Sequence, residues 1–100
     1  MRSTDKFDVA LHLEVAEHTP DWPLHIAHMK NLLDHRTGLL IFTAACYERA
    51  PHSASDGGPL QEAEYYLNVD PDHLSTILTR NFAKHVIDVQ GDDVRAAAWR

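Results

Sequence analysis

Apolar and polar residues alternate along the first part of the chain, from residue 7 to residue 17. A repeat of two residues is typical of a β-strand, whose successive side chains point to opposite faces of a sheet, so this pattern predicts a strand over residues 7–17. The more polar face also contains alanine, which suits a semi-polar interior or a partner surface. One face carries Phe7, Val9, Leu11, Leu13 and Val15, and the other carries Asp8, Ala10, His12, Glu14 and Ala16.

The pattern changes to a helical repeat over residues 22–36. Apolar residues recur there at spacings of three to four, as on one side of an α-helix, and predict a helix over this range. Thr19 or Asp21 can cap its start, and Gly38 suits the position just after its end. The apolar stripe consists of Trp22, Ile26, Met29 and Leu33.

A second helix is predicted from Asp70 to about Lys84. Asp70 is a capping residue, Pro71 suits the first helical position, and Asp72 places negative charge in the first turn. The apolar stripe of this helix consists of Leu74, Ile77, Leu78 and Phe82.

The remaining segments predict strands and one loop. Residues 39–47 are apolar and indicate a central strand that is buried on both faces. Residues 50–59 are rich in glycine, proline and serine and predict a loop, whereas the alternation over residues 61–69 predicts another strand. Residues 85–90 also predict a strand. After a turn that contains glycine, residues 94–99 form either a short final hairpin strand or a tail.

The order of these elements is β-α-β-β-α-β, with or without a fifth strand. This order is typical of a ferredoxin-like α+β fold, in which two helices cover one face of an antiparallel sheet, and we expect one such domain over residues 1–100. A chain of this size rarely leaves a sheet face bare, so we expect a homodimer in which a second subunit covers the open face. The residues expected on that face are Ala10, His12, Glu14, Glu62, Glu64 and Tyr66.

Composition narrows the classes of partner. Nine basic and 15 acidic residues among 100 give a formal net charge of −6, which argues against binding to nucleic acid or an anionic membrane surface. No apolar run approaches the ~20 residues of a membrane span, and the N-terminus leads into no secretory signal. The single cysteine, Cys46, cannot form an internal disulfide, so we expect a cytoplasmic protein. Eight histidines make the net charge sensitive to pH near neutrality.

The segment from Pro23 to Met29, followed by Leu32-Leu33 and Gly38-Leu39-Leu40, resembles a YCII-related domain. The resemblance covers roughly residues 22–45. It implies a dimeric α+β barrel, and with it a histidine–aspartate chemistry in which His25 takes the place of the histidine. The resemblance assigns no aspartate, because Asp70-Pro71 precedes the second helix instead of following it.

The predicted first helix also suggests chemistry from its spacing. Asp21, His25 and His28 are four and three residues apart and therefore share one side of the helix. Asp21 can orient His25 as a general base, with His28 as a ligand-binding residue; alternatively, Asp21 only caps the helix and His25 is a boundary residue. These groups are also metal ligands, but they lack the pattern of the helical His-Glu-x-x-His motif, so we expect no metal.

His12 and Glu14 provide a second candidate pocket. They share a face of the first predicted strand, about 7 Å apart. Together with Tyr66 they can form an acid–base site that binds a ligand; interface salt bridges or solvated positions are the alternatives. Cys46 lies in an apolar strand and is expected to be a buried structural thiol.

Two functional hypotheses follow from these expectations. The first is a small-molecule-binding barrel, with isomerase-like or lyase-like proton transfer by His25 and no cofactor. The second is a non-catalytic module that uses the open sheet face for ligand sensing or protein interaction. Both are open, because ferredoxin-like domains host many functions.

Overall fold

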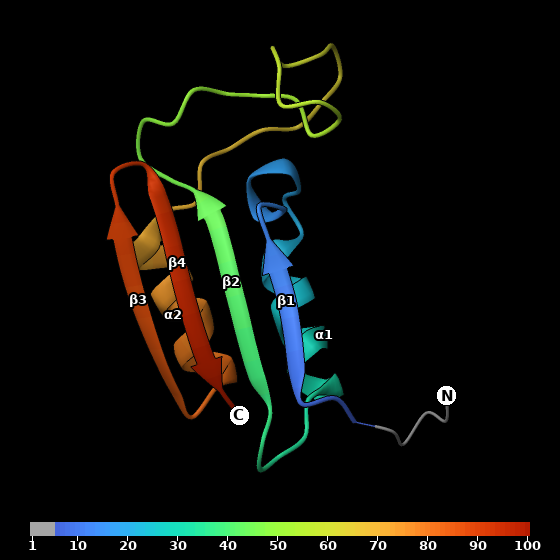
Figure 1. Cartoon of the computed structure of the whole chain (residues 1–100), viewed down its shortest axis with the longest axis vertical. Coiled ribbons are helices and arrows are strands. Elements are labelled where there is room, and N and C mark those ends of the chain that lie inside the picture. The colour runs from blue at the N-terminus through green and yellow to red at the C-terminus, as the bar shows by residue number, and fades with distance from the viewer. Residues whose placement is uncertain (1–5) are drawn as a thin grey trace.

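The structure is a computed structural model that describes residues 6–100, and it contains one four-stranded sheet and two α-helices (Figure 1). A short 3-10 helix, η1, lies between the first strand and the first α-helix. None of the helices in this part of the chain is long and apolar enough to cross a membrane. The elements are β1 (Val9–Leu13), η1 (Ala16–His18), α1 (Trp22–Leu32), β2 (Leu39–Ala45), α2 (Pro71–Asn81), β3 (Lys84–Gln90) and β4 (Asp93–Trp99).

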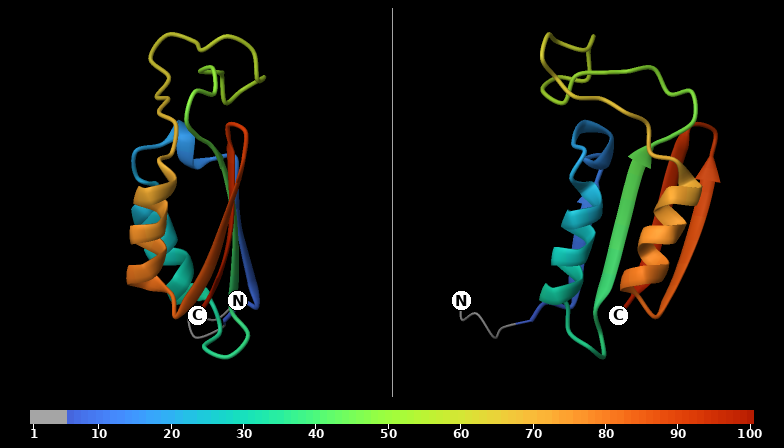
Figure 2. Two further views of the ribbon diagram at one scale, coloured as in Figure 1. Left: turned by 90° about the vertical axis from the view of Figure 1, so that its left-hand side faces the viewer. Right: turned by 180° about the vertical axis from the view of Figure 1, so that it is seen from behind.

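The strands follow the order β1-β2-β4-β3 across the sheet. β1 and β2 pair in parallel, whereas β4 pairs antiparallel with both β2 and β3. Because α1 connects two adjacent parallel strands, β1, α1 and β2 form a crossover unit. Both helices lie on the same face of the sheet, as the side view in Figure 2 shows.

This topology contradicts the ferredoxin-like prediction. A ferredoxin-like sheet is antiparallel, but here β1 lies directly beside β2 in parallel, with Val9 opposite Leu39 and Leu13 opposite Thr43. The predicted strand over residues 61–69 is wrong, since this range belongs to the long connection between β2 and α2. Ala63 interrupts the extended backbone with a φ of 69°. The strand that separates the first two strands of a ferredoxin-like sheet is therefore absent from residues 61–69.

The end of α1 differs from the predicted one. The helix stops at Leu32, and Leu33 is extended and buried. The Asp34 carboxylate then accepts hydrogen bonds from the backbone N–H groups of Arg36 and Thr37, which closes a turn in place of further helix. Gly38 is required by close approach: a Cβ atom there would lie 2.4 Å from the carbonyl oxygen of Asp34.

One other local prediction is confirmed, and one open alternative is decided. The Asp70 side chain caps α2 by accepting a hydrogen bond from the Asp72 N–H at 3.0 Å, and Pro71 occupies the first turn. Residues 94–99 belong to a strand, because β4 forms a hairpin with β3 and continues antiparallel along β2. This places β4 in the interior of the sheet, although it is the last strand in the chain.

The hydrophobic core lies between the sheet and the two helices. β2 and β4 point small and large apolar side chains toward the helices, and the stripes of α1 and α2 pack onto them. Cys46 belongs to this core, as predicted for a structural thiol, and burial raises its pKa. Buried members from the strands are Leu40, Phe42, Ala44, Val94, Ala96 and Ala98, and those from the helices are Trp22, Ile26, Leu74, Ile77 and Leu78.

The two faces of β1 are reversed relative to the prediction. His12, expected on the open face, is buried below the helices, whereas Val9, Leu11 and Leu13 are exposed on the other side. Alternation separates two faces but does not say which one the helices cover. Here Ala10 and His12 face the helix layer, together with Leu40 and Phe42 of β2. Of the residues predicted for the open face, Glu62, Glu64 and Tyr66 are not in the sheet at all.

Candidate functional site

The carboxyl ends of β1 and β2 lie side by side at one edge of the sheet, because the two strands are parallel neighbours. Immediately after them, Glu14 and Tyr47 adopt the left-handed backbone region, with φ values of 56° and 49°. Non-glycine residues rarely take this conformation, and it concentrates at functional sites. The Glu14 N–H donates to the Thr43 carbonyl at 2.9 Å, which holds the two strand ends together.

Glu17 of η1 lies below this edge and has no solvent exposure. Its Oε2 atom accepts a hydrogen bond from the Ala45 N–H at 2.6 Å, so the carboxylate is fixed against the end of β2. Its Oε1 atom is buried and has no hydrogen-bond partner among residues 6–100. Burial of a carboxylate oxygen without a hydrogen-bond donor is costly, so such an oxygen is a candidate ligand for a cation.

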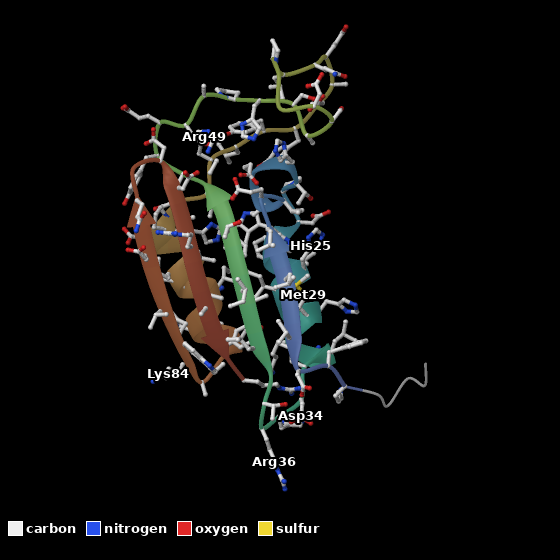
Figure 3. All side chains as sticks on the ribbon, in the orientation of Figure 1. His25, Met29, Asp34, Arg36, Arg49 and Lys84 are labelled. Carbon is white, nitrogen blue, oxygen red and sulfur yellow. The ribbon has the colours of Figure 1, made fainter. Side chains whose placement is uncertain are left out.

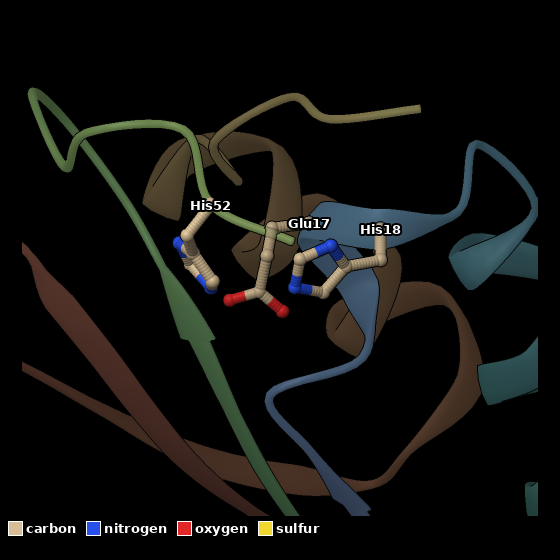
Figure 4. Close-up of side chains that lie close together, drawn as sticks. All are labelled: Glu17, His18 and His52. Atoms are coloured by element: carbon tan, nitrogen blue, oxygen red, sulfur yellow. The ribbon is translucent and has the colours of Figure 1, made fainter. Parts of the chain in front are cut away.

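His18 and His52 flank this carboxylate, as Figure 4 shows. His18 follows Glu17 in η1, and His52 comes from the long connection between β2 and α2. The ring centroids of His18 and His52 are 4.9 Å apart in an edge-to-face arrangement. Each of the three side chains offers one metal-ligating atom, and these atoms lie within 4.8 Å of one another. We call Glu17, His18 and His52 the edge cluster.

Tyr66 covers the two histidines of the edge cluster. Its ring centroid is 5.5 Å from that of His18 and 5.0 Å from that of His52. Its hydroxyl donates to the Asn68 side chain at 2.6 Å, and the Asn68 amide donates in turn to the backbone carbonyls of Tyr47 and Arg49. Burial, and next the nearby Glu17 carboxylate, raise the pKa of the Tyr66 phenol. The long connection is therefore held across the edge cluster by side chains.

An open cleft of about 350 Å³ leads to the cluster. It is bounded on one side by the turn after β1 and on the other by the long connection. Ser53 is buried in its wall and donates to the Glu64 carboxylate at 2.8 Å. The cleft is lined by Glu14, Val15, His18, His52, Ser53, Ala54 and Gly57.

The predicted catalytic residues lie elsewhere: His25 is on α1 (Figure 3), and Asp21 is the residue that precedes this helix. His25 Nδ1 is 3.2 Å from His12 Nε2, so His25 pairs with His12. The Asp21 carboxylate is not a hydrogen-bond partner of His25 among the described residues; the helical bond joins the His25 N–H to the Asp21 carbonyl. His28 is exposed. The roles assigned to His25, Asp21 and His28 stay predictions.

His12 is separated from its predicted companions Glu14 and Tyr66. Its ring stacks on Phe42 with a centroid distance of 5.3 Å and an interplanar angle of 3°. Burial, and next the neighbouring His25, lower the pKa of His12. Glu14 and Tyr66 lie at the cleft and against the edge cluster, so the structure places two of the predicted ligand-binding residues there. Their binding roles also stay predictions.

None of the three residues of the edge cluster was predicted as a site residue from the sequence. The sequence does contain a signal for two of its members. Glu17 and His18 lie shortly after β1, which ends at Leu13, and residues that follow a parallel strand line the carboxyl edge of the sheet. The prediction instead extended this strand to residue 17, which hid the signal. No local signal marks His52, because it lies in a loop and approaches Glu17 only through the tertiary structure.

No family model and no curated protein matches the chain. Among solved structures, the chain is similar to DhpI in its complex with SAH, with a TM-score of 0.67 and 14% identity over 97% of this chain and 48% of that one. It is also similar to a SAM-dependent methyltransferase from Bacteroides fragilis in complex with S-adenosyl-L-homocysteine, with a TM-score of 0.57 and 20% identity over 96% of this chain and 48% of the other.

The fold is therefore similar to that of about half of each of these two methyltransferase structures, and the chain spans about half the length of the solved structures that it matches. The YCII-related resemblance was wrong, and so was the dimeric α+β barrel that it implied. The matching stretch was a helix followed by glycine and a strand, which a parallel β-α-β unit contains equally well.

The functional hypotheses are corrected together with the fold. Both the isomerase or lyase activity and the non-catalytic sensing or interaction module were placed on a ferredoxin-like sheet, and the methyltransferase neighbours overturn that basis. The expected homodimer stays a prediction.

Proposed function

We propose that this chain forms one half of a SAM-dependent methyltransferase and takes part in methyl transfer to a small molecule. The observation that carries the proposal is the likeness to DhpI. The alignment covers 97% of this chain but only 48% of the DhpI chain. Both neighbours are complexes with S-adenosylhomocysteine, the product that SAM leaves after methyl transfer.

The uncovered face of the sheet supports a role as one half of a larger fold. Val9, Leu11 and Leu13 of β1 expose apolar side chains there, and Val86 of β3 continues the apolar surface. An open cleft of about 300 Å³ lies on this face over β4, which separates β2 from β3. β1 is also an edge strand whose outer side can accept a further strand. A second half that adds a strand beside β1 and packs a further layer on the uncovered face would cover both features.

The described residues do not form a cofactor site by themselves. In Rossmann-like folds, the nucleotide-containing cofactor binds at a glycine-rich turn between a strand and a helix. The turn between β1 and α1, residues 14–21, contains no glycine, and the long connection before α2 has its glycines at positions 57 and 58, far from the helix start. We therefore assign the cofactor to the second half and the acceptor substrate to the cleft beside the edge cluster.

The acceptor assignment rests on the chemistry of the cleft. A methyl acceptor loses a proton when its oxygen or nitrogen gains the methyl group, so the site needs groups that orient the acceptor and receive that proton. Glu14 lines the cleft and offers a carboxylate for both tasks, and the rings of His18 and His52 form part of the wall against which an acceptor would pack. This cleft also lies at the carboxyl edge of the sheet, where open α/β folds bind their ligands.

A chimera tests the proposal. The half of the Bacteroides fragilis methyltransferase that this chain matches is replaced by this chain, and binding of S-adenosylhomocysteine is measured by calorimetry. We expect the chimera to bind the ligand, and this chain alone to show no saturable binding. The matched control is the chimera with Leu11→Lys, which places a charge on the uncovered face.

The outcomes are distinct because folding is measured first, by circular dichroism. A folded chimera that does not bind S-adenosylhomocysteine contradicts the proposal. Equal binding by the chimera and its Leu11→Lys variant contradicts the assignment of the uncovered face. Tight binding by this chain alone contradicts the assignment of the cofactor to a second half.

A further inference from the structure

The geometry points to a divalent transition-metal site formed by Glu17, His18 and His52, which we infer independently of the methyltransferase proposal. Two imidazoles and one carboxylate are a donor set typical of Zn²⁺, Mn²⁺, Fe²⁺ and Co²⁺. Their ligating atoms lie within 4.8 Å of one another, and Figure 4 shows the carboxylate between the two rings. Metal–ligand bonds of about 2.0–2.2 Å are reached after a small contraction of this set.

The burial of Glu17 is the independent observation that a ligand belongs here. Its side chain is fully buried, and Oε1 accepts no hydrogen bond from the part of the chain that the structure describes, although both histidines are close. A buried negative charge is retained when a cation or a set of donors compensates it. No Lys or Arg forms an ion pair with Glu17: the ion pairs of the described residues are Arg49–Asp93 and Arg95–Asp88. A bound cation would supply this compensation.

Neighbouring groups orient the ligands. The Ala45 N–H holds Glu17 Oε2 at 2.6 Å, so the carboxylate has a fixed direction. His52 Nδ1 is 3.2 Å from the Ala50 carbonyl, and a hydrogen bond there leaves Nε2 free to bind a metal ion. Metal-ligating histidines commonly use their second nitrogen in this way. Tyr66 packs on both rings and limits their rotation.

Access and coordination number suit an exchangeable site. The cleft of about 350 Å³ reaches His18 and His52, so an ion can enter from solvent. Three protein ligands leave at least one coordination position for water or for an oxygen or nitrogen atom of a substrate. This inference runs against the expectation of no metal, which rested on Asp21, His25 and His28; none of these three residues belongs to the edge cluster.

The ions themselves are the probes for the test. Co²⁺ is titrated into the metal-free chain while its visible absorption is recorded, because the intensity of the bands reports coordination number and ligand type. Zn²⁺ binding is measured separately by calorimetry. We expect one ion per chain for each metal.

Two variants and one control locate the site. His52→Ala removes a loop ligand without touching the core, and Glu17→Gln keeps an oxygen that can accept the Ala45 hydrogen bond. We expect each variant to weaken Zn²⁺ binding by ~10-fold or more and to change the Co²⁺ spectrum. His35→Ala, which removes an exposed histidine, is expected to bind like the unchanged chain.

Three results overturn the inference. They are the absence of saturable binding by the unchanged chain, the same affinity in His52→Ala, and an equal loss in His35→Ala, which would indicate general chelation by histidines. If Glu17→Gln fails to fold, His52→Ala alone decides the outcome. Because these measurements use neither SAM nor a second half, they are separate from the chimera experiment.

Discussion

The two faces of the sheet differ in a way that β1 shows most clearly. His12 and Leu11 are adjacent in the sequence, yet the polar side chain is 3% exposed and the apolar one is 57% exposed. His12 lies below the helix layer, stacked on Phe42, while Leu11 lies on the uncovered face. Polarity alone would assign the opposite faces. The difference indicates that the uncovered face has the character of an interaction surface, because exposed apolar patches of this kind mark interaction sites.

The largest expected effect comes from the covered face. Phe42→Ala removes a fully buried ring that contacts Trp22 and His12, and we expect it to lower the free energy of unfolding by about 3–5 kcal/mol. Urea unfolding monitored by circular dichroism measures this loss. If Phe42→Ala lowered the free energy of unfolding by less than the ~0.5 kcal/mol typical of an exposed site, the placement of Phe42 in the core would be contradicted.

Gly38 tests the connection between α1 and β2 on the same covered side. In Gly38→Ala, the new Cβ would lie 2.4 Å from the Asp34 carbonyl oxygen and 2.7 Å from Leu33 Cβ. Because backbone atoms cannot easily move, we expect a loss of about 1–3 kcal/mol in the free energy of unfolding. Gly58→Ala is the control, since its nearest neighbour is a side-chain atom of Asp56 at 3.1 Å. Equal losses in the two variants would argue against the close approach.

His12 makes the covered face sensitive to acid. Its pKa is lowered in the folded state, so the unfolded chain takes up a proton at His12 before the folded chain does. The contribution of neutral His12 to the free energy of unfolding is therefore fully present above the ordinary histidine pKa of 6.5. This contribution is lost as the pH falls from 6.5 through the lower pKa of the folded state. We expect the decrease in melting temperature between pH 7 and pH 5 to be smaller in His12→Phe than in the unchanged chain. An identical pH profile in the two proteins would contradict the role of His12, and His35→Ala is the control.

The smallest effect on stability is expected on the uncovered face. Leu11→Lys should change the free energy of unfolding by less than about 0.5 kcal/mol, because the side chain is already exposed. The same change should reduce concentration-dependent association, which light scattering measures. A loss comparable to that of Phe42→Ala would show that Leu11 is buried within the chain itself, and the contrast between the faces would disappear.

Local patterns determined most of the elements of this protein. The alternation around Leu11, the helical stripe from Trp22 to Leu33 and the cap at Asp70 each act over a few residues, where steric preference and hydrogen bonding favour one backbone conformation. The glycine-containing turn before β4 indicated a hairpin as one of two alternatives, and pairing with β3 decided for it. These features were predictable because the residues responsible are neighbours in the chain. The failure over residues 61–69 has the same origin, since alternation cannot reveal that a segment finds no partner strand.

Only the tertiary structure decided the order of the strands, the covered face and the edge cluster. β1 pairs with β2, and β4 enters between β2 and β3, through hydrogen bonds between residues that are far apart in the sequence. Packing against the helices then selected the face with His12 instead of the face with Leu11. Glu17 and His52 are 35 positions apart in the sequence, and the long connection after β2 brings them together. Contacts of this kind depend on the free energy of the whole fold, which no short window of sequence contains.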